Sequence, residues 1–202
     1  MHALAIASDR DDRPQEDHFV FLHDVTWSDY ERILEIRGDH SAPRIAYLEG
    51  WLEIMSPSEN HEEIKSLIGR LVEVWCLEHK IRFAIRGSWT LKDKALERGA
   101  EPDECYIFGP LRGATRPDLA IEVIWTSGRL NKLNIYRKLG VAEVWIWERG
   151  KLTPYVLRGE SYEEMSESEK LPGINLAELA SFLDQPTSSD AIEAYRDRLR
   201  SR

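Results

Sequence analysis

Five successive segments decide the fold: DECYIF (103–108), GPLRGATRP (109–117), DLAIEVIW (118–125), GRLNKLNIYRKL (128–139) and VAEVWIW (141–147). The first and third are apolar runs of strand length, and the turn between them holds two glycines and two prolines. The fourth is amphipathic with helical spacing, and Gly140 follows it as a favourable C-cap. The order predicts two antiparallel neighbouring strands, then a helix and a further strand of the same sheet.

Glu122 is the single charge inside the apolar run 119–125. A run that is apolar on both faces is typical of a central strand covered on both sides. A buried carboxylate must be paired, protonated or bound to a cation, because an isolated buried charge is costly. A strand-edge glutamate paired with an arginine is the alternative interpretation.

Asp103 stands at the start of the strand that precedes this run. In an antiparallel pair the start of one strand lies near the end of the other, so we expect Asp103 to lie closer to Glu122 than to Asp118. Two carboxylates held together repel each other unless a divalent cation sits between them. Magnesium suits such oxygen ligands and retains waters for phosphate chemistry.

The flanking sequence predicts further strands and helices. A helix is expected over 26–36, with Thr26 or Ser28 as its cap, and a hairpin over 44–55. The longest helix begins at Ser58 and shows apolar residues at helical spacing. Other expected elements are a strand at 81–86, an edge hairpin at 151–165, and helices at 176–183 and 188–200. This interleaving predicts an α/β or α+β domain with a mixed sheet.

The whole chain has 202 residues, which suits a flexible arm over 1–20 and a single domain over 21–202. Its composition, 42% hydrophobic and 31% charged, is typical of a soluble protein. No stretch approaches the roughly 20 apolar residues of a membrane span, and we find no secretion signal. Cys76 and Cys105 lie in apolar segments without metal-ligand spacing. We therefore expect a cytoplasmic protein with two buried thiols and no zinc site.

The formal net charge of −9 argues against a simple module that coats nucleic acid, since such proteins are usually basic. It argues less against a nuclease, because a metal centre is itself built from carboxylates.

Several stretches together resemble one family: EPDECYIF (101–108), RPDLAIEVIW (116–125), KLNIYRKLGVAEVWIW (132–147), RIAYLEGWLEIMSPSENHE (44–62) and GSWTLKDKALERGAEPDECY (87–106). They are similar to the Uma-type restriction endonucleases, a bacterial family within the PD-(D/E)XK nuclease superfamily. The resemblance covers roughly residues 27–147. It implies a restriction-endonuclease-like α+β fold, with a mixed β-sheet flanked by helices, and a nuclease-like domain over 21–202.

The resemblance also implies a site. Its catalytic residues would be Glu62, Asp103, Glu122 and Lys132. Magnesium or manganese would be bound by Asp103, Glu122 and Asp118. The lysine of the superfamily normally stands two residues after the strand glutamate, where this sequence has Ile124. Lys132, in the following helix, is the expected substitute.

Several of these candidate site residues could instead have a purely structural role. Asp118 could bind metal, or it could cap the strand entry and anchor Arg116 or Arg112. Glu62 and Lys132 could be solvated helix residues. His61 could contact phosphate, although a structural role is the more common one for a lone histidine in a first helical turn. Tyr136 is expected to pack rather than react.

Two other groups suggest nucleic-acid contacts. Three tryptophans, Trp125, Trp145 and Trp147, could stack on bases, but their place in or beside central strands favours core packing. Four basic residues could face phosphates or form a solvated helix face: Arg129, Lys132, Arg137 and Lys138.

Two functions follow from the sequence. The first is a magnesium-dependent endonuclease that hydrolyses DNA phosphodiester bonds. The second is a catalytically degenerate relative that acts as a binding or regulatory module, which Ile124 and the acidic net charge favour. The sequence does not fix the oligomeric state, and a homodimer is compatible with a nuclease that cuts both strands.

Overall fold

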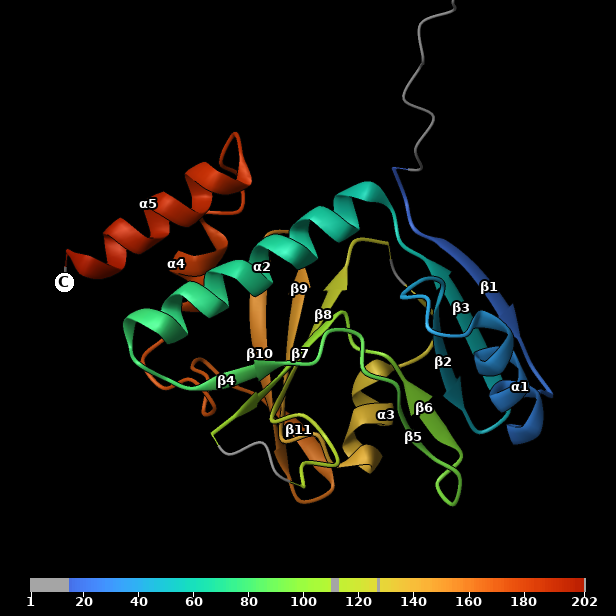
Figure 1. Cartoon of the computed structure of the whole chain (residues 1–202). Coiled ribbons are helices and arrows are strands. Elements are labelled where there is room, and N and C mark those ends of the chain that lie inside the picture. The colour runs from blue at the N-terminus through green and yellow to red at the C-terminus, as the bar shows by residue number, and fades with distance from the viewer. Residues whose placement is uncertain (1–14, 110–112, 127, 202) are drawn as a thin grey trace, which may run out of the picture.

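The computed structural model describes residues 15–109, 113–126 and 128–201, and this part of the chain forms two β-sheets and five helices (Figure 1). Sheet A is antiparallel, in the order β1 (His18–Leu22), β3 (Trp51–Ser56), β2 (Arg44–Leu48), β6 (Arg98–Ala100) and β5 (Leu91–Asp93). Sheet B has the order β11 (Ser161–Glu164), β10 (Lys151–Arg158), β9 (Glu143–Glu148), β8 (Leu119–Ile124), β7 (Glu104–Phe108) and β4 (Phe83–Ile85). The helices are α1 (Trp27–Arg37), α2 (Glu59–Glu78), α3 (Lys132–Leu139), α4 (Leu176–Ala180) and α5 (Ser188–Arg200).

The predicted strand pair forms the centre of sheet B. β7 and β8 are antiparallel with Glu104 opposite Ile121, and the Asp103 amide donates to the Ile121 carbonyl at 3.1 Å. Asp103 therefore lies beside Glu122, as expected. β8 and β9 are parallel, and α3 connects them, so sheet B is mixed. The predicted α+β class is confirmed.

Helix α2 crosses one face of sheet B (Figure 1). Its apolar side packs on the alternate β8 residues Leu119, Ile121 and Val123 in one core, with α5 lying along its outer side. The other residues of β8, including Ala120 and Glu122, point to the opposite face. Ala120 packs there in a second core that includes residues of α3. The site is therefore built on the α3 face of the sheet.

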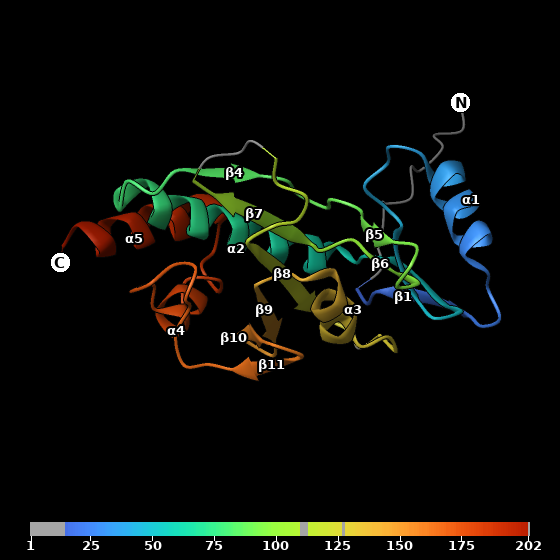
Figure 2. The same ribbon diagram turned by 90° about the horizontal axis from the view of Figure 1, so that it is seen from below.

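Helix α3 lies between the two sheets (Figure 2). It contacts β5 and β6 of sheet A, and its Ile135 packs with Ala46 and Val144 from different sheets. The other face of sheet A is covered by α1, where Trp27, Tyr30 and Tyr47 form an aromatic cluster. This arrangement brings the N-terminal end of α3 against β3.

Local signals in the sequence correspond to the observed ends of elements. Thr26, rather than Ser28, caps α1 in a reciprocal capping box with Asp29, and Ser58 caps α2. The β2–β3 hairpin turns at Glu49 and Gly50, both with positive φ, which glycine adopts without strain. Cys76 and Cys105 are buried free thiols.

The predicted arm over residues 1–20 extends too far. Residues 1–14 lie outside the described part of the chain. Asp17 is buried, however, and the next residues form β1, which pairs with β3 from His18 opposite Ser56. The sequence HFVFL of residues 18–22 is rich in aromatic and β-branched residues, a composition typical of a strand. Of the helices described, none is long and apolar enough to cross a membrane.

Candidate active site

Glu122 and Lys132 line a cavity of about 370 Å³ between the end of β8, the face of β3 and the N-terminal ends of α2 and α3, and Asp103 is buried beside Glu122. The titratable lining of this cavity includes Asp17, Glu53, His61, Glu122 and Lys132. A larger cavity of about 920 Å³ lies between the β10–β11 hairpin and α4, and it contains none of the predicted site residues. The smaller cavity is therefore the candidate active site.

Glu122 is buried on the α3 face of β8, and its Oε1 accepts a short hydrogen bond from the Tyr136 hydroxyl. Burial raises the pKa of Glu122 to about 7; the neighbouring Asp103 charge acts in the same direction, and Lys132 and Tyr136 oppose it. The negative charge of this carboxylate is thus incompletely compensated by the protein. Such a group binds either a proton or a cation near neutral pH. Tyr136, expected only to pack, is fully buried and also holds this carboxylate.

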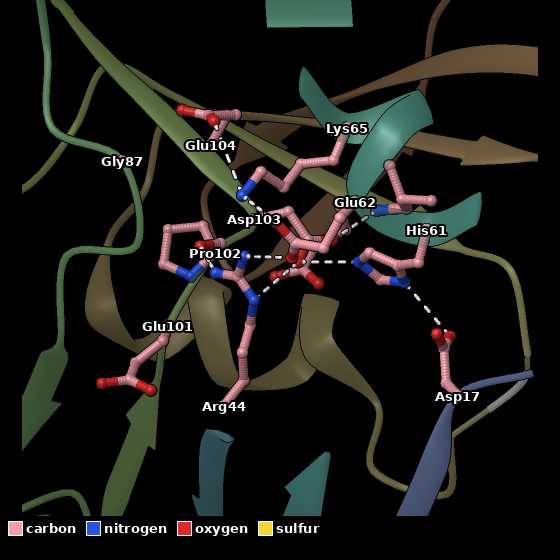
Figure 3. A network of polar contacts seen from close by, with 12 residues as sticks. Asp17, Arg44, His61, Glu62, Lys65, Gly87, Glu101, Pro102, Asp103 and Glu104 are labelled. Carbon is pink, nitrogen blue, oxygen red and sulfur yellow. Dashed lines mark hydrogen bonds and ion pairs between the residues drawn. The ribbon is translucent and has the colours of Figure 1, made fainter. Parts of the chain in front are cut away.

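Asp103 is held by groups from three elements (Figure 3). Its Oδ2 accepts from the Val123 amide at 2.7 Å, and its Oδ1 lies 3.1 Å from both Arg44 Nε and His61 Nε2. Burial alone would raise its pKa, but the Arg44 charge and His61 outweigh burial and hold the pKa well below its usual range. Asp103 is therefore ionised, in contrast to its neighbour Glu122.

The contacts of Asp103 Oδ1 with Arg44 and His61 are close, but they do not have hydrogen-bond geometry. Asp103 Oδ1, Arg44 Nε and His61 Nε2 are all buried, and none of the three atoms has a well-formed hydrogen bond among the described residues. Their attraction is that of close charges. The Arg44 guanidinium also donates to the Pro102 carbonyl at 2.9 Å and contacts Glu62 at 3.3 Å. Oδ1 consequently retains the capacity to accept a further ligand.

His61 joins Asp103 to the start of the described chain. Its Nδ1 lies 3.1 Å from Asp17 Oδ2, and Figure 3 shows the ring between the two carboxylates. Burial disfavours the charged ring, but the close carboxylates of Asp103 and Asp17 outweigh burial and raise the pKa of His61 to about 9. His61 is therefore an imidazolium at neutral pH. It is a buried member of the charge network, not a surface residue.

Glu53 was missed in the sequence, although it is only 2% exposed and lines the same cavity. Its Oε2 accepts from the amides of Arg129 and Leu130 at 3.0 and 3.1 Å. Its Oε1 lies 3.6 Å from the Lys132 ammonium. The carboxylate thus fixes the segment that enters α3 and holds the lysine at the cavity.

Lys132 is the first residue of α3 and its side chain is 19% exposed. It points into the cavity that Glu122 lines and does not extend into solvent. Burial would lower the pKa of its ammonium, but the charges of Glu122 and Glu53 outweigh burial and raise the pKa. The Lys132 ammonium is therefore held as a cation by Glu53 and Glu122, in the same cavity that Ile124 lines.

Two predicted residues lie outside this group. Asp118 is at the opposite end of β8, where its carboxylate accepts from the Phe108 amide at 2.9 Å and contacts Lys170 at 3.3 Å. It caps the strand entry and lies away from Asp103 and Glu122. Of its two expected partners, Arg112 lies outside the described residues, and Arg116 forms no ion pair with Asp118 in the described part of the chain. Glu62 is 42% exposed and pairs with Lys65 at 2.8 Å, reaching Asp103 only through Arg44.

The tryptophans and basic residues considered as nucleic-acid contacts are mostly buried or paired with carboxylates. Trp145 and Trp147 are core residues, as favoured, while Trp125 is partly exposed and stacks on Trp147 at 5.9 Å. Of the basic residues near α3, Arg137 and Lys138 both contact Glu160. A continuous phosphate-facing strip is therefore not formed.

The geometry is compatible with a divalent cation at Asp103 and Glu122. The described residues contain no group of three or more His, Cys, Asp or Glu side chains already arranged as a metal site. Two observations nevertheless fit a cation: the raised pKa of Glu122 and the buried Asp103 Oδ1 without a well-formed hydrogen bond. Waters commonly complete the coordination of magnesium, so two protein carboxylates are a sufficient set.

Comparisons with known proteins identify one family and one similar solved structure. A family model described as "Putative restriction endonuclease", with the name Uma2, matches residues 27–183. A crystal structure described as a putative nuclease belonging to DUF820, from Anabaena variabilis, is similar at 16% identity and a TM-score of 0.46. That match covers 85% of this chain and 99% of the other chain. No curated protein matches the chain.

Proposed function

From the premise that the chain belongs to the Uma2 restriction endonuclease family, we propose that it is a metal-dependent endonuclease that hydrolyses DNA phosphodiester bonds in the cavity described above. The observation that carries the proposal is the convergence of Asp103, Glu122 and Lys132 from three different elements. Carboxylates beside a retained lysine provide both a cation site and a fixed positive charge.

Asp103 and Glu122 would hold the cation. When bound, a divalent cation polarises the scissile phosphate and lowers the pKa of the attacking water. Tyr136 fixes one oxygen of Glu122 by its hydrogen bond, which orients the carboxylate. The Val123 amide does the same for Asp103. Both ligands are thus oriented by the protein before substrate arrives.

Lys132 is placed to stabilise the negative charge that develops on the phosphate oxygens. Glu53 positions it by fixing the backbone of the preceding residues and by contacting the ammonium. Arg44 and His61 balance the charge of Asp103 in the metal-free protein. A protein without these two cations would bury two adjacent carboxylates with little compensation, which is costly.

The proposal is tested with wild type, Glu122→Gln and Asp118→Asn, each assayed for plasmid cleavage with magnesium or manganese and with chelator. The amide keeps the size of Glu122 but loses the charge that holds the cation, so cleavage should be abolished in a folded protein. Asp118→Asn is the matched control on the same strand, and it should cut like wild type because its carboxylate faces Lys170.

Melting temperatures are measured on the same preparations. Magnesium or manganese should raise the melting temperature of wild type and of Asp118→Asn, and not that of Glu122→Gln, because a ligand of the folded state stabilises it. Cleavage by Glu122→Gln at the wild-type rate, or a mutant that melts far below wild type, would rule out the assignment.

A degenerate nuclease-fold module is the second candidate, and two observations favour it. Asp103 is already paired with Arg44 and His61, and Ile124 replaces the usual lysine. A protein of this kind would bind DNA without cutting it. Stabilisation by metal without cleavage in any of the assays above would favour this second function.

A further inference from the structure

One half of the site-side face of sheet A is not covered by α3. The helix packs on β5 and β6, whereas β1 forms the outer edge of the sheet beyond β3 (Figure 1). In the register of these strands Phe19 lies opposite Met55 and Phe21 opposite Glu53, and alternation places both pairs on the same face. Met55 and Glu53 line the candidate active site, so this open half of the sheet continues directly from the cavity.

Aromatic rings are concentrated on that open half. Phe19 lines the cavity, and its ring stacks on that of Phe21 with centroids 5.6 Å apart. Trp51, two residues before Glu53 on the same face, is 50% exposed and lies 5.5 Å from the His23 ring. We call Phe19, Phe21 and Trp51 the aromatic platform. Trp51 is exposed, and Phe19 and Phe21 are half-buried. Large aromatic side chains are normally buried, so rings left partly exposed beside a cavity mark a binding surface.

Arg129 adds a cation to the platform. Its guanidinium carbon lies 4.7 Å from the centre of the Phe21 ring, and the residue is exposed at the cavity. The three other basic residues considered near α3 are paired with Glu53 or Glu160. The Arg129 side chain shows no carboxylate partner within the described part of the chain. An arginine that stacks on a ring and keeps its donors free is suited to a phosphate or a base.

We propose that the aromatic platform and Arg129 bind unpaired nucleotides of a DNA strand, so that the substrate of the adjacent site is single-stranded on one side of the scissile phosphate. The inference rests on the proposed nuclease function and specifies its substrate class. Base faces are available for stacking on protein rings in a single strand, whereas in a duplex they are already stacked on each other.

The charge of the chain agrees with this choice. A net charge of −9 gives weak attraction to the dense phosphates of a duplex. Stacking does not depend on net charge, and one unpaired arginine next to the rings supplies a local phosphate contact. Binding should therefore depend on salt only weakly, with a slope near that of one phosphate contact, about 0.7 for single strands.

The test measures binding without cleavage. Fluorescence anisotropy is recorded for the full chain in chelator with a short labelled oligothymidine strand and with a duplex of the same length. Wild type should bind the single strand more tightly. Phe21→Leu and Trp51→Leu keep apolar burial but remove the ring, and each should weaken single-strand binding roughly fivefold or more, since stacking is worth about 1–3 kcal/mol per base.

Matched variants provide the controls. Leu22→Ala changes an exposed apolar residue of β1 that points to the opposite face, and it should bind like wild type. Arg129→Ala should weaken binding and reduce its salt dependence, whereas Arg82→Ala, an exposed arginine just before β4, should change neither. All variants are compared with wild type in melting temperature and in mass by light scattering.

The outcomes separate the explanations. Equal affinity of wild type for single strand and duplex, or wild-type binding by the Leu variants, would overturn the platform. So would a wild-type dimer that the Leu variants dissociate, because the face would then join two copies of the chain. The predicted binding pattern without metal-dependent cutting would refute the nuclease function and leave the platform standing.

Discussion

Glu122 and Asp103 are neighbours on adjacent strands, yet their environments drive their pKa values in opposite directions. Asp103 is surrounded by Arg44, His61 and the Val123 amide, all of which favour its ionised form. Burial and the Asp103 charge disfavour the ionised form of Glu122, and Lys132 and Tyr136 offset this effect only in part. Asp103 is therefore charged before any cation binds, whereas Glu122 is only partly charged near neutral pH until a cation binds.

The pH dependence of stability in chelator tests this assignment. The folded pKa of Glu122, about 7, is above its ordinary value of 4.5, so the folded state holds a proton that the unfolded state has lost. The stability of wild type relative to Glu122→Gln should be greatest below pH 4.5 and fall as pH rises through about 7, by up to about 3 kcal/mol. Urea unfolding of both proteins across this range measures the difference. A difference that is constant with pH, or that grows in favour of wild type, contradicts the assignment.

The sequence predicts some of these residues and not others, for a physical reason. Glu122 is recognisable as a lone charge in an apolar strand, and the turn before it predicts its closeness to Asp103. Glu53 shows the same lone charge in WLEIM (51–55), but no turn-linked partner indicates its role. Arg44 and His61 meet Asp103 only because sheet A and α2 dock on sheet B, which no local pattern encodes.

At the scale of elements, Asp17 connects three of them. Its carboxylate accepts from the Ser58 amide at the start of α2 at 2.8 Å and from the Thr126 amide after β8 at 3.2 Å, and it contacts His61. The first described strand, β1, is thereby attached to both segments that carry site residues. The sequence-based prediction placed Asp17 in a flexible arm because Asp17 ends an acidic run. The strand-forming residues 18–22 that follow it form β1 and hold Asp17 in the fold.

Asp17→Asn should lower the free energy of unfolding by about 1.5–3 kcal/mol, the range for hydrogen bonds to a charged group. The pKa of His61, raised to about 9, means that its charged form stabilises the fold below its ordinary value of 6.5 and that this contribution is lost as pH rises through about 9. The variant should show a smaller loss over that interval. Hydrogen exchange of residues 18–22 should accelerate more than that of 119–124. Asp24→Asn, at an exposed pair with His23, is the control and should change neither.

Strand pairing within sheet B follows from the sequence more directly than the relation between sheets. β7 and β8 are consecutive strands of the chain, and β9 follows α3 in the usual way for parallel neighbours, so local signals determine both pairings. The division into two sheets with α3 between them depends on apolar contacts such as Ile135 with Ala46. Such contacts join residues that are far apart in the chain, and no periodic pattern in a single sequence predicts which residues will meet.

At the scale of the molecule, the two sheets meet around α3 and leave the cavity at their junction (Figures 1 and 2). Sheet B contributes Asp103 and Glu122, sheet A contributes Glu53 and the aromatic platform, and α3 contributes Lys132. The candidate active site, the carboxylate of Glu53 that positions Lys132, and the surface proposed to bind a DNA strand therefore adjoin one another. The acidic net charge is compatible with this arrangement, because the positive groups proposed to act on a substrate are few and local.

The most direct test of the central claim is a crystal structure of wild type soaked with manganese, with the anomalous signal measured. We predict a peak between Asp103 and Glu122 at the cavity, with Arg44 or His61 moved away from Asp103 Oδ1, and no peak in Glu122→Gln treated in the same way. Absence of a peak at saturating manganese, with Arg44 and His61 still against Asp103, would contradict the claim that these two carboxylates form a metal site.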